Sequence, residues 1–329
     1  MWPLVLFGVV TVTFIILHAT PVDPIRARAA IRGMGVDPVY IETMNRIYGF
    51  DRPVPEQYFR YIGNVLRGDL GVSIDNPTKP VGQILVSRLP ATMELTAAAL
   101  VFALGIGIPL GIVSALHRNK LADHVARMLS LGAVAMPAFW FGLILLIVFF
   151  YYLGIFPSSG RLGFIQSPPP HVTGFYTIDS LLSGRLDLFK AALVHMVLPA
   201  FTLSIGAIAM LARLTRSGML ETLSKDYIRL ATSIGLPKRT INYKLALKNT
   251  LIPTVTFLGL AVGSMLGGSI IIETVFSWPG LGQFAVTALL SKDLYAVMGV
   301  VLMMALVYSL FSLIVDLLYG ILDPRIRYG

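Results

Sequence analysis

Six long stretches without a charged side chain constrain the fold of this 329-residue chain more than any other feature. Each stretch contains more than twenty residues, and a helix needs about 20 mostly apolar residues to cross the hydrocarbon core of a bilayer. The six stretches are Met1–Val22, Leu95–His117, Met128–Gly160, Ala191–Ala212, Asn249–Ile272 and Leu294–Val315. One such stretch is compatible with a buried helix of a soluble protein, but six together predict an all-α integral membrane protein with six transmembrane helices.

Charged residues are scarce over the whole chain, at 13 %, while hydrophobic residues reach 56 %. Soluble domains carry about 25 % charged residues, so this chain lacks the polar surface that a soluble protein needs. It contains no cysteine, which excludes disulfides and thiolate metal sites. Neither a His-Glu-x-x-His metal motif nor a Gly-x-x-x-x-Gly-Lys-Ser/Thr phosphate loop occurs in it. We therefore expect no catalytic residue, no metal site and no cofactor on this chain.

Basic residues gather between the predicted fourth and fifth spans. The segment Arg213–Lys248 carries eight basic and two acidic residues, which is +6 out of a total net charge of +9. Short cytoplasmic loops of membrane proteins are enriched in Lys and Arg, so we expect this segment and both termini to face the cytoplasm. Residues 1–20 are expected to be a retained first transmembrane helix rather than a signal peptide, because no basic residue precedes the apolar run.

The remaining segments divide the chain into three predicted parts. Residues 21–88 fall on the extracytoplasmic side, and helical patterns that start near Pro38 and Pro55 predict a small helical subdomain there. Residues 89–329 are expected to form a core of five transmembrane helices. Pro137 lies inside the predicted third span, where neighbouring helices can tolerate a kink.

Glycines recur on one face of the predicted fifth span. Gly259, Gly263 and Gly267 are spaced four residues apart, which favours a tight helix contact. The alternative is that this face lines a pathway or gate for a solute. Glu273 lies near the outer end of the same span, where a role in helix packing or at the membrane interface competes with a direct role in transport.

A short helix is predicted inside the basic segment. Residues 226–234 contain no helix breaker and are amphipathic, with Tyr227, Leu230, Ala231 and Ile234 near one face. Gly235 can end this helix, Leu236-Pro237 redirects the chain, and a second helix is expected over residues 240–247. The pattern predicts a docking element for another protein; the alternative is a basic loop attracted to anionic lipid.

This segment resembles the EAA loop of ABC importer permeases, in the form found in the dipeptide/oligopeptide/nickel family. The residues that match the family motif are Asp226, Tyr227, Arg229, Ala231, Gly235 and Leu236. The general motif has Glu-Ala-Ala where this chain has Arg229-Leu230-Ala231, a departure that is usual in the peptide branch. Further similar motifs are Tyr48–Pro53, Arg67–Ser73, Arg88–Thr92, Pro137–Trp140, Arg213–Arg216, Glu273–Gly282 and Leu322–Arg325. The long first outer segment resembles the B-type, or first, permease subunit of such systems.

The resemblance implies the type I importer permease fold in a prokaryotic plasma membrane, with the coupling loop over residues 216–250. It implies four partners: a second homologous permease, two cytoplasmic ABC ATPases that bind ATP and Mg, and an extracytoplasmic substrate-binding protein. Membrane lipid surrounds the complex, and no nucleic acid is involved. The residues expected to contact an ATPase are Asp226, Tyr227, Arg229, Leu230, Ala231, Ile234, Gly235, Leu236 and Pro237.

The function that the resemblance implies is import of dipeptides or oligopeptides, with this chain as a non-catalytic subunit. Nickel, glutathione and oligosaccharides are the alternative substrates within the same family resemblance. Two other functional classes compete with this interpretation. One is a secondary transporter driven by an ion gradient, which predicts inverted repeats and charges at the membrane midplane. The other is an intramembrane enzyme that uses His195 with Glu273, although no motif pairs these two residues.

Overall fold

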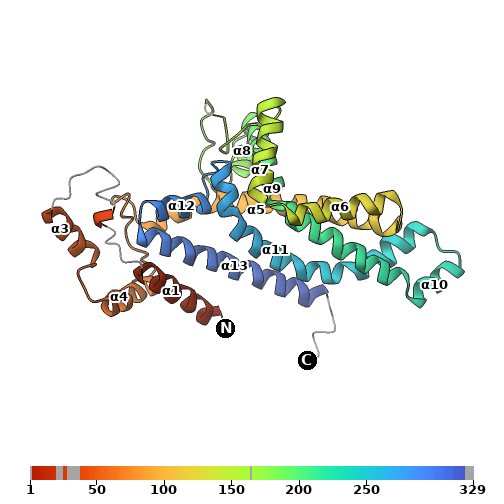
Figure 1. The fold of residues 1–329 in the computed structure, drawn as a ribbon, viewed down its shortest axis with the longest axis horizontal. Helices are drawn as coiled ribbons and strands as arrows, with labels where there is room; N and C mark the ends of the chain where they lie inside the picture. Colours follow the sequence, from red (N-terminus) through yellow and green to blue (C-terminus); the bar gives the residue numbers. More distant parts are fainter. Residues whose placement is uncertain (1, 20–24, 28–37, 164, 323–329) are drawn as a thin grey trace. The chain divides into compact units, whose positions relative to one another are not determined.

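A computed structural model describes residues 2–19, 25–27, 38–163 and 165–322 of the protein. The named elements within these residues are all helices (Figure 1). They are α1 (Trp2–Ala19), α3 (Pro38–Tyr48), α4 (Val54–Leu66), α5 (Val81–Leu116), α6 (Leu121–Ala135), α7 (Ala138–Leu145), η1 (Leu146–Tyr152), α8 (Tyr176–Leu182), α9 (Leu186–Leu223), α10 (Asp226–Ser233), η2 (Thr240–Ala246), α11 (Leu247–Val275), α12 (Leu281–Leu290) and α13 (Leu294–Leu322). The predicted all-helical class is confirmed for this part of the chain. The motif at Leu322–Arg325 lies outside the described residues, apart from Leu322.

Four helices are long and apolar enough to cross a membrane. Their spanning segments are Val81–Leu116, Leu186–Leu223, Phe257–Val275 and Leu294–Val315, and each overlaps one of the six uncharged stretches. The first stretch forms a shorter apolar helix over Leu4–Ala19. The third stretch is not one continuous helix, because α6 and α7 meet at a bend of 108°. The structure therefore supports four spans, or five with the bent pair counted as one.

The bend follows from Pro137. Proline disfavours the helical conformation of the residue before it, and Met136 accordingly takes φ −94° and ψ 127°. Pro137 itself has ψ 130°, and α7 starts directly after it. The sequence predicted a tolerated kink within one span, whereas the structure has a full break between two helices.

The chain forms two compact units. The first consists of Met1–Thr92 with Pro279–Ser309, and the second of Met93–Trp278 with Leu310–Gly329. In the first unit, Phe14 of α1 and Tyr61 of α4 share a buried apolar cluster with Met298 of α13. The helices predicted within residues 21–88 are present as α3 and α4. The three-part division of the chain stays a prediction.

Helix α9 is the centre of the second unit, where α6, α7, α8 and α11 all pack against it. Its contact with α5 depends on two glycines. A Cβ atom at Gly107 would lie 2.8 Å from Cβ of Leu211, and one at Gly111 would lie 2.6 Å from the carbonyl oxygen of Ala212. At 38 residues, α9 is about 57 Å long, well beyond the roughly 30 Å of hydrocarbon in a bilayer. The helix is therefore longer than one crossing of the hydrocarbon requires.

Candidate functional site

Helix α10 lies at the end of α9, in a loop that returns through η2 to α11 (Figure 1). Ile228 and Ala231 point into this loop and form a buried cluster with Ile241 of η2. Leu223 of α9 and Leu245 of η2 pack against the same cluster. The short helix is thus fixed by apolar contacts to the elements on both sides of it.

The neighbouring flank of α10 exposes large apolar side chains. Leu230 is 63 % exposed, Ile234 is 68 % exposed and Tyr227 is 41 % exposed. Ala231, which the sequence places near the same face, is only 5 % exposed and belongs to the buried cluster; its contact with an ATPase stays a prediction. The sequence has apolar residues on two flanks of α10: one flank holds the helix in place and the other remains open.

Polar contacts occur at the first turn of α10 and at the start of the segment that follows it. The amide of Asn249 on α11 donates a hydrogen bond of 2.9 Å to the hydroxyl of Tyr227. Asp226 and Arg229 form an ion pair at 3.3 Å with both side chains largely exposed, a type of contact that adds little stability. The carbonyl of Pro237 accepts hydrogen bonds from the amides of Thr240 and Ile241, which starts the next helical segment.

Gly235 ends α10 in the left-handed region of backbone conformation, with φ +79°. Its amide donates to the carbonyl of Thr232, and the amide of Leu236 donates to the carbonyl of Ala231, both at 3.1 Å. These two bonds form a Schellman motif, which favours glycine at this position because other residues avoid positive φ. A Cβ atom at Gly235 would meet nothing within 4 Å. The backbone conformation, rather than crowding within this chain, explains the glycine.

The three glycines spaced along one face of α11 differ in the space around them. A Cβ atom at Gly259 would lie 3.0 Å from Val315 of α13, whereas one at Gly267 would meet nothing within 4 Å. Gly263 between them is partly buried. Glu273, near the other end of α11 from the α10 loop, is fully buried. A tight helix contact therefore exists at Gly259, and open space exists at Gly267.

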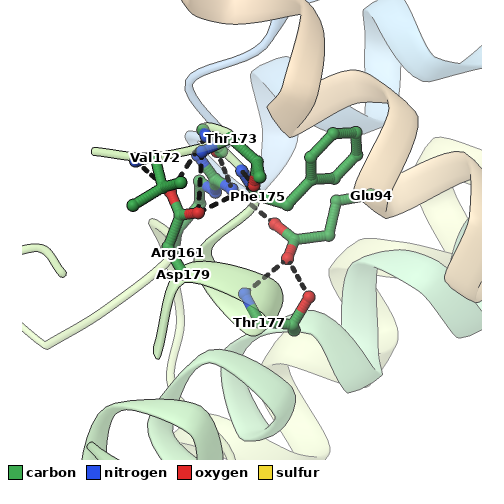
Figure 2. Close-up of polar contacts among 8 residues, drawn as sticks. Glu94, Arg161, Val172, Thr173, Phe175, Thr177 and Asp179 are labelled. Carbon is green, nitrogen blue, oxygen red and sulfur yellow. Dashed lines mark hydrogen bonds and ion pairs between the residues drawn. The ribbon is translucent and has the colours of Figure 1, made fainter. Parts of the chain in front are cut away.

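A buried polar network holds the loop between η1 and α9 (Figure 2). Arg161 forms an ion pair with Glu94 of α5, donates to the carbonyl of Gly174 at 3.0 Å and stacks on Tyr176 at 3.6 Å. Thr177 donates to the second oxygen of Glu94 from its amide at 2.8 Å and from its hydroxyl at 2.6 Å. Glu94 is 5 % exposed and Arg161 is 6 % exposed. Glu94 therefore anchors this loop.

Asp179 of α8 closes the same loop from the other side (Figure 2). Burial acts to raise the pKa of this carboxyl, but hydrogen bonds from the hydroxyl and amide of Thr173 and from the amides of Gly174 and Val172 hold its pKa below the ordinary value. The carboxylate accepts these bonds at 2.7 to 3.3 Å. Asp179 thus stays ionised and fixes the turn at residues 172–174.

The Glu94–Arg161 pair predicts a large effect of one substitution. Glu94→Gln leaves the charge of Arg161 buried without its carboxylate, and breaking a buried pair in this way costs about 3–5 kcal/mol. We expect a marked fall in the melting temperature of the detergent-purified protein. The matched control is Asp187→Asn, which removes the carboxylate of the exposed Arg185–Asp187 pair and should leave the melting temperature unchanged. Equal melting temperatures for both variants would contradict the anchoring role.

Sequence reasoning identified Glu94 only as a charge near a span end and missed its partners. The available signal was Arg161, the first charged residue after the third uncharged stretch. Ile228 and Asn249 were missed as well, although they hold α10 in place. Within the residues that the structure describes, no group of three or more His, Cys, Asp or Glu side chains could hold a metal ion.

Comparison with known families gives two matches. Residues 107–328 match the model of the binding-protein-dependent transport system inner membrane component. Residues 3–96 match the model of the N-terminal part of the membrane component of such systems. Together they cover nearly the whole chain.

Curated relatives align with this chain over its full length. The probable D,D-dipeptide transport system permease protein DdpB of Escherichia coli K12 is 46 % identical over 100 % of this chain and 96 % of its own. The dipeptide transport system permease protein DppB of the same organism is 40 % identical over 98 % and 94 %. The oligopeptide transport system permease protein AppB of Bacillus subtilis 168 is 34 % identical over 98 % and 96 %. The resemblance predicted from the sequence is confirmed: this chain belongs to the family of inner membrane components of binding-protein-dependent transport systems, together with permeases named for dipeptide and oligopeptide transport.

Proposed function

We propose that this chain is a permease subunit of an ATP-driven importer of dipeptides or oligopeptides, and that it forms half of the translocation pathway. The names of its relatives support the substrate class. The observation that carries the coupling role is the exposed apolar flank of α10, which the rest of the loop holds in a fixed orientation. Six spans, cytoplasmic termini and a small extracytoplasmic helical subdomain complete the proposed topology.

The proposed partners are a second homologous permease, two cytoplasmic ABC ATPases and an extracytoplasmic substrate-binding protein. ATP and Mg bind to the ATPases, and this chain has no catalytic residue. Tyr227, Leu230 and Ile234 fill a groove of one ATPase, while Arg229 and Asp226 lie at its polar edge. Closure of the ATPases around ATP favours one conformation of the permeases, because ATP binds the closed state more tightly.

The contacts around α10 explain how such a movement reaches the membrane. Ile228 and Ala231 connect α10 to α9 and η2 through one buried cluster. The Tyr227–Asn249 hydrogen bond connects it to the first turn of α11. A force on α10 is therefore passed to two long helices of the same unit rather than absorbed by a flexible loop. Gly267 and Glu273 on α11 are the proposed pathway or gate residues at the far end of this connection, with Gly263 beside them and Gly259 as the packing contact.

Gly235→Val tests this coupling role. Valine is strained at φ +79°, which distorts the turn and adds a branched side chain where a partner docks; left-handed conformation costs an L-residue about 1–2 kcal/mol. We expect coupled peptide uptake to fall at least tenfold, with normal insertion of the chain in the membrane. Uptake of labelled dipeptide into proteoliposomes and membrane fractionation measure the two properties.

Gly184→Val is the matched control. Gly184 also has a positive φ, of +69°, and a Cβ atom there would also meet nothing within 4 Å. The strain is thus similar, but the position lies in the loop before α9, at the other end of that helix from α10. The control should insert normally and keep its coupled uptake. Wild-type uptake by Gly235→Val would refute the coupling assignment.

The competing ion-coupled mechanism predicts a different dependence on energy. Uptake by such a transporter follows the ion gradient and does not require the ATPases. Uptake that persists with ATPase-inactive partners, and that stops when the gradient is dissipated, would therefore replace the proposed function. Binding measurements on the substrate-binding protein with dipeptides, nickel, glutathione and oligosaccharides distinguish the substrate classes.

A further inference from the structure

Two adjoining hollows lie between α6 and α9 in the second unit. The first has a volume of about 380 Å³ and is lined almost wholly by apolar side chains, among them Leu129, Met136, Phe201 and Ile205. The second has a volume of about 240 Å³, and three of its lining residues are arginines: Arg127, Arg213 and Arg216. Ser130 of α6 lines both hollows. We call the two hollows together the α6/α9 groove.

The order of these residues along the helices gives the groove one apolar end and one basic end. On α9 the apolar hollow is lined by residues from Phe201 to Ala209, and the basic hollow by residues from Ala212 to Ser217. On α5 the same change occurs between Leu110 and Ser114. Arg213 lies eight positions after Ile205 on α9, which corresponds to about 12 Å along the helix.

The basic end carries excess positive charge. Asp123 is fully buried and accepts two hydrogen bonds from Arg216, at 2.7 and 2.9 Å. Nε of Arg127 lies 3.6 Å from the same carboxylate. Arg213 is exposed and, among the residues that the structure describes, it has no hydrogen bond or ion pair. Asp123 thus pairs with Arg216 and Arg127 but not with Arg213, and one carboxylate beside three guanidinium groups leaves this end of the groove with a net charge of +2.

This combination fits an anionic phospholipid. The polar layer on each side of a bilayer is roughly 5–7 Å thick. The distance of about 12 Å between the apolar and the basic ends of the groove exceeds this thickness, so the groove can reach from the hydrocarbon into the headgroups. Arginine binds phosphate oxygens through paired N–H donors, and basic pockets between transmembrane helices bind anionic headgroups. We propose that the α6/α9 groove binds one anionic phospholipid, with its phosphate at Arg213 and Arg127 and one acyl chain in the apolar hollow beside α6. The charge at one end argues for lipid rather than for an apolar helix of a second permease.

Native mass spectrometry of the full transporter complex tests the proposal, with dioleoylphosphatidylglycerol, dioleoylphosphatidylcholine and inorganic phosphate as probes. We expect phosphatidylglycerol to bind more tightly than phosphatidylcholine. Arg213→Gln should weaken binding of phosphatidylglycerol about five-fold, the effect of one basic residue near an anionic headgroup. Lys244→Gln is the matched control, because Lys244 is equally basic and exposed but lies on η2, away from the groove. This control should bind phosphatidylglycerol like the wild type.

A second pair of variants separates a lipid from free phosphate. A Cβ atom at Gly132, which lines the apolar hollow, would meet nothing within 4 Å, so the backbone there accepts a side chain and Gly132→Phe brings a ring to the groove. Gly206→Phe is the control, since Gly206 is equally open and lines neither hollow. We expect Gly132→Phe alone to abolish binding of phosphatidylglycerol and to leave binding of inorganic phosphate unchanged.

Three results would overturn the proposal. The first is equal binding of phosphatidylglycerol and phosphatidylcholine. The second is tight binding of inorganic phosphate that competes fully with the lipid, when Gly132→Phe changes neither the binding of phosphate nor the binding of the lipid. The third is release of the second permease by Gly132→Phe, which would assign the apolar hollow to a contact between permeases.

Discussion

Replacement of both Leu230 and Ile234 by glutamate should weaken the association of the ATPases with the permease by at least about 100-fold. Burial of a leucine or isoleucine side chain contributes about 1.5–3 kcal/mol, and each 1.4 kcal/mol changes a dissociation constant tenfold. These two side chains are 63 % and 68 % exposed on α10, so they are free to be buried by a partner. Glutamate removes that contribution and would add an unpaired charge to an apolar groove.

The measurement is the dissociation constant of the ATPases for the permease in nanodiscs. Phe59→Glu with Leu66→Glu is the matched control, because these apolar residues of α4 are 72 % and 83 % exposed and lie in the predicted extracytoplasmic part. The control should bind the ATPases like the wild type. If the α10 variant bound the ATPases as tightly as the wild type, the result would instead favour the alternative that this basic loop is attracted to anionic lipid and does not dock on a protein.

The position of α10 was largely predictable, because its limits depend on local chemistry. The expected helix covered residues 226–234, and the observed one is Asp226–Ser233 with its Schellman turn at Gly235. A glycine followed by Leu-Pro indicates such an end from sequence alone. The flank of α10 that turns inward was not predictable, since it depends on Ile241 and Leu245 of the following segment.

Four of the six expected spans were predictable for a different reason. Lipid excludes charge over about 20 residues at a time, so the uncharged stretches locate the helices whatever their packing. The break at Pro137 could be located but its angle of 108° could not. Proline frees backbone groups, and the neighbouring residues decide whether the helix bends slightly or stops.

The loop network around Glu94 shows what sequence reasoning cannot reach. Glu94 and Arg161 are 67 residues apart, and Thr177 is 83 residues from Glu94. Periodicity describes one element at a time, whereas these contacts join a long helix to a loop and to the start of α8. Their charges were visible in the sequence, but their pairing depends on the way the chain folds.

Gly111→Leu should destabilise the protein by about 3 kcal/mol or more. A Cβ atom at Gly111 would lie 2.6 Å from the carbonyl oxygen of Ala212 and 3.1 Å from the amide nitrogen of Arg216. Both are backbone atoms of α9, so no side chain can move aside to make room. Overpacking of a tight core typically costs about 1–3 kcal/mol even where side chains can adapt. Close approach of helices through small residues is also a main source of stability within a membrane.

Gly105→Leu is the matched control, six residues earlier on α5, where a Cβ atom would meet nothing within 4 Å. Leucine is a better helix former than glycine by roughly 0.8 kcal/mol, so this control should be as stable as the wild type or slightly more stable. Unfolding in detergent, followed by tryptophan fluorescence, measures both variants. The Gly111 contact with Ala212 and Arg216 lies in the last part of α9, which ends at Leu223 before the chain enters α10. Loss of this contact should therefore also reduce coupled uptake. Equal stability of the Gly111→Leu and Gly105→Leu variants would show that α5 and α9 do not pack as closely as the glycines indicate.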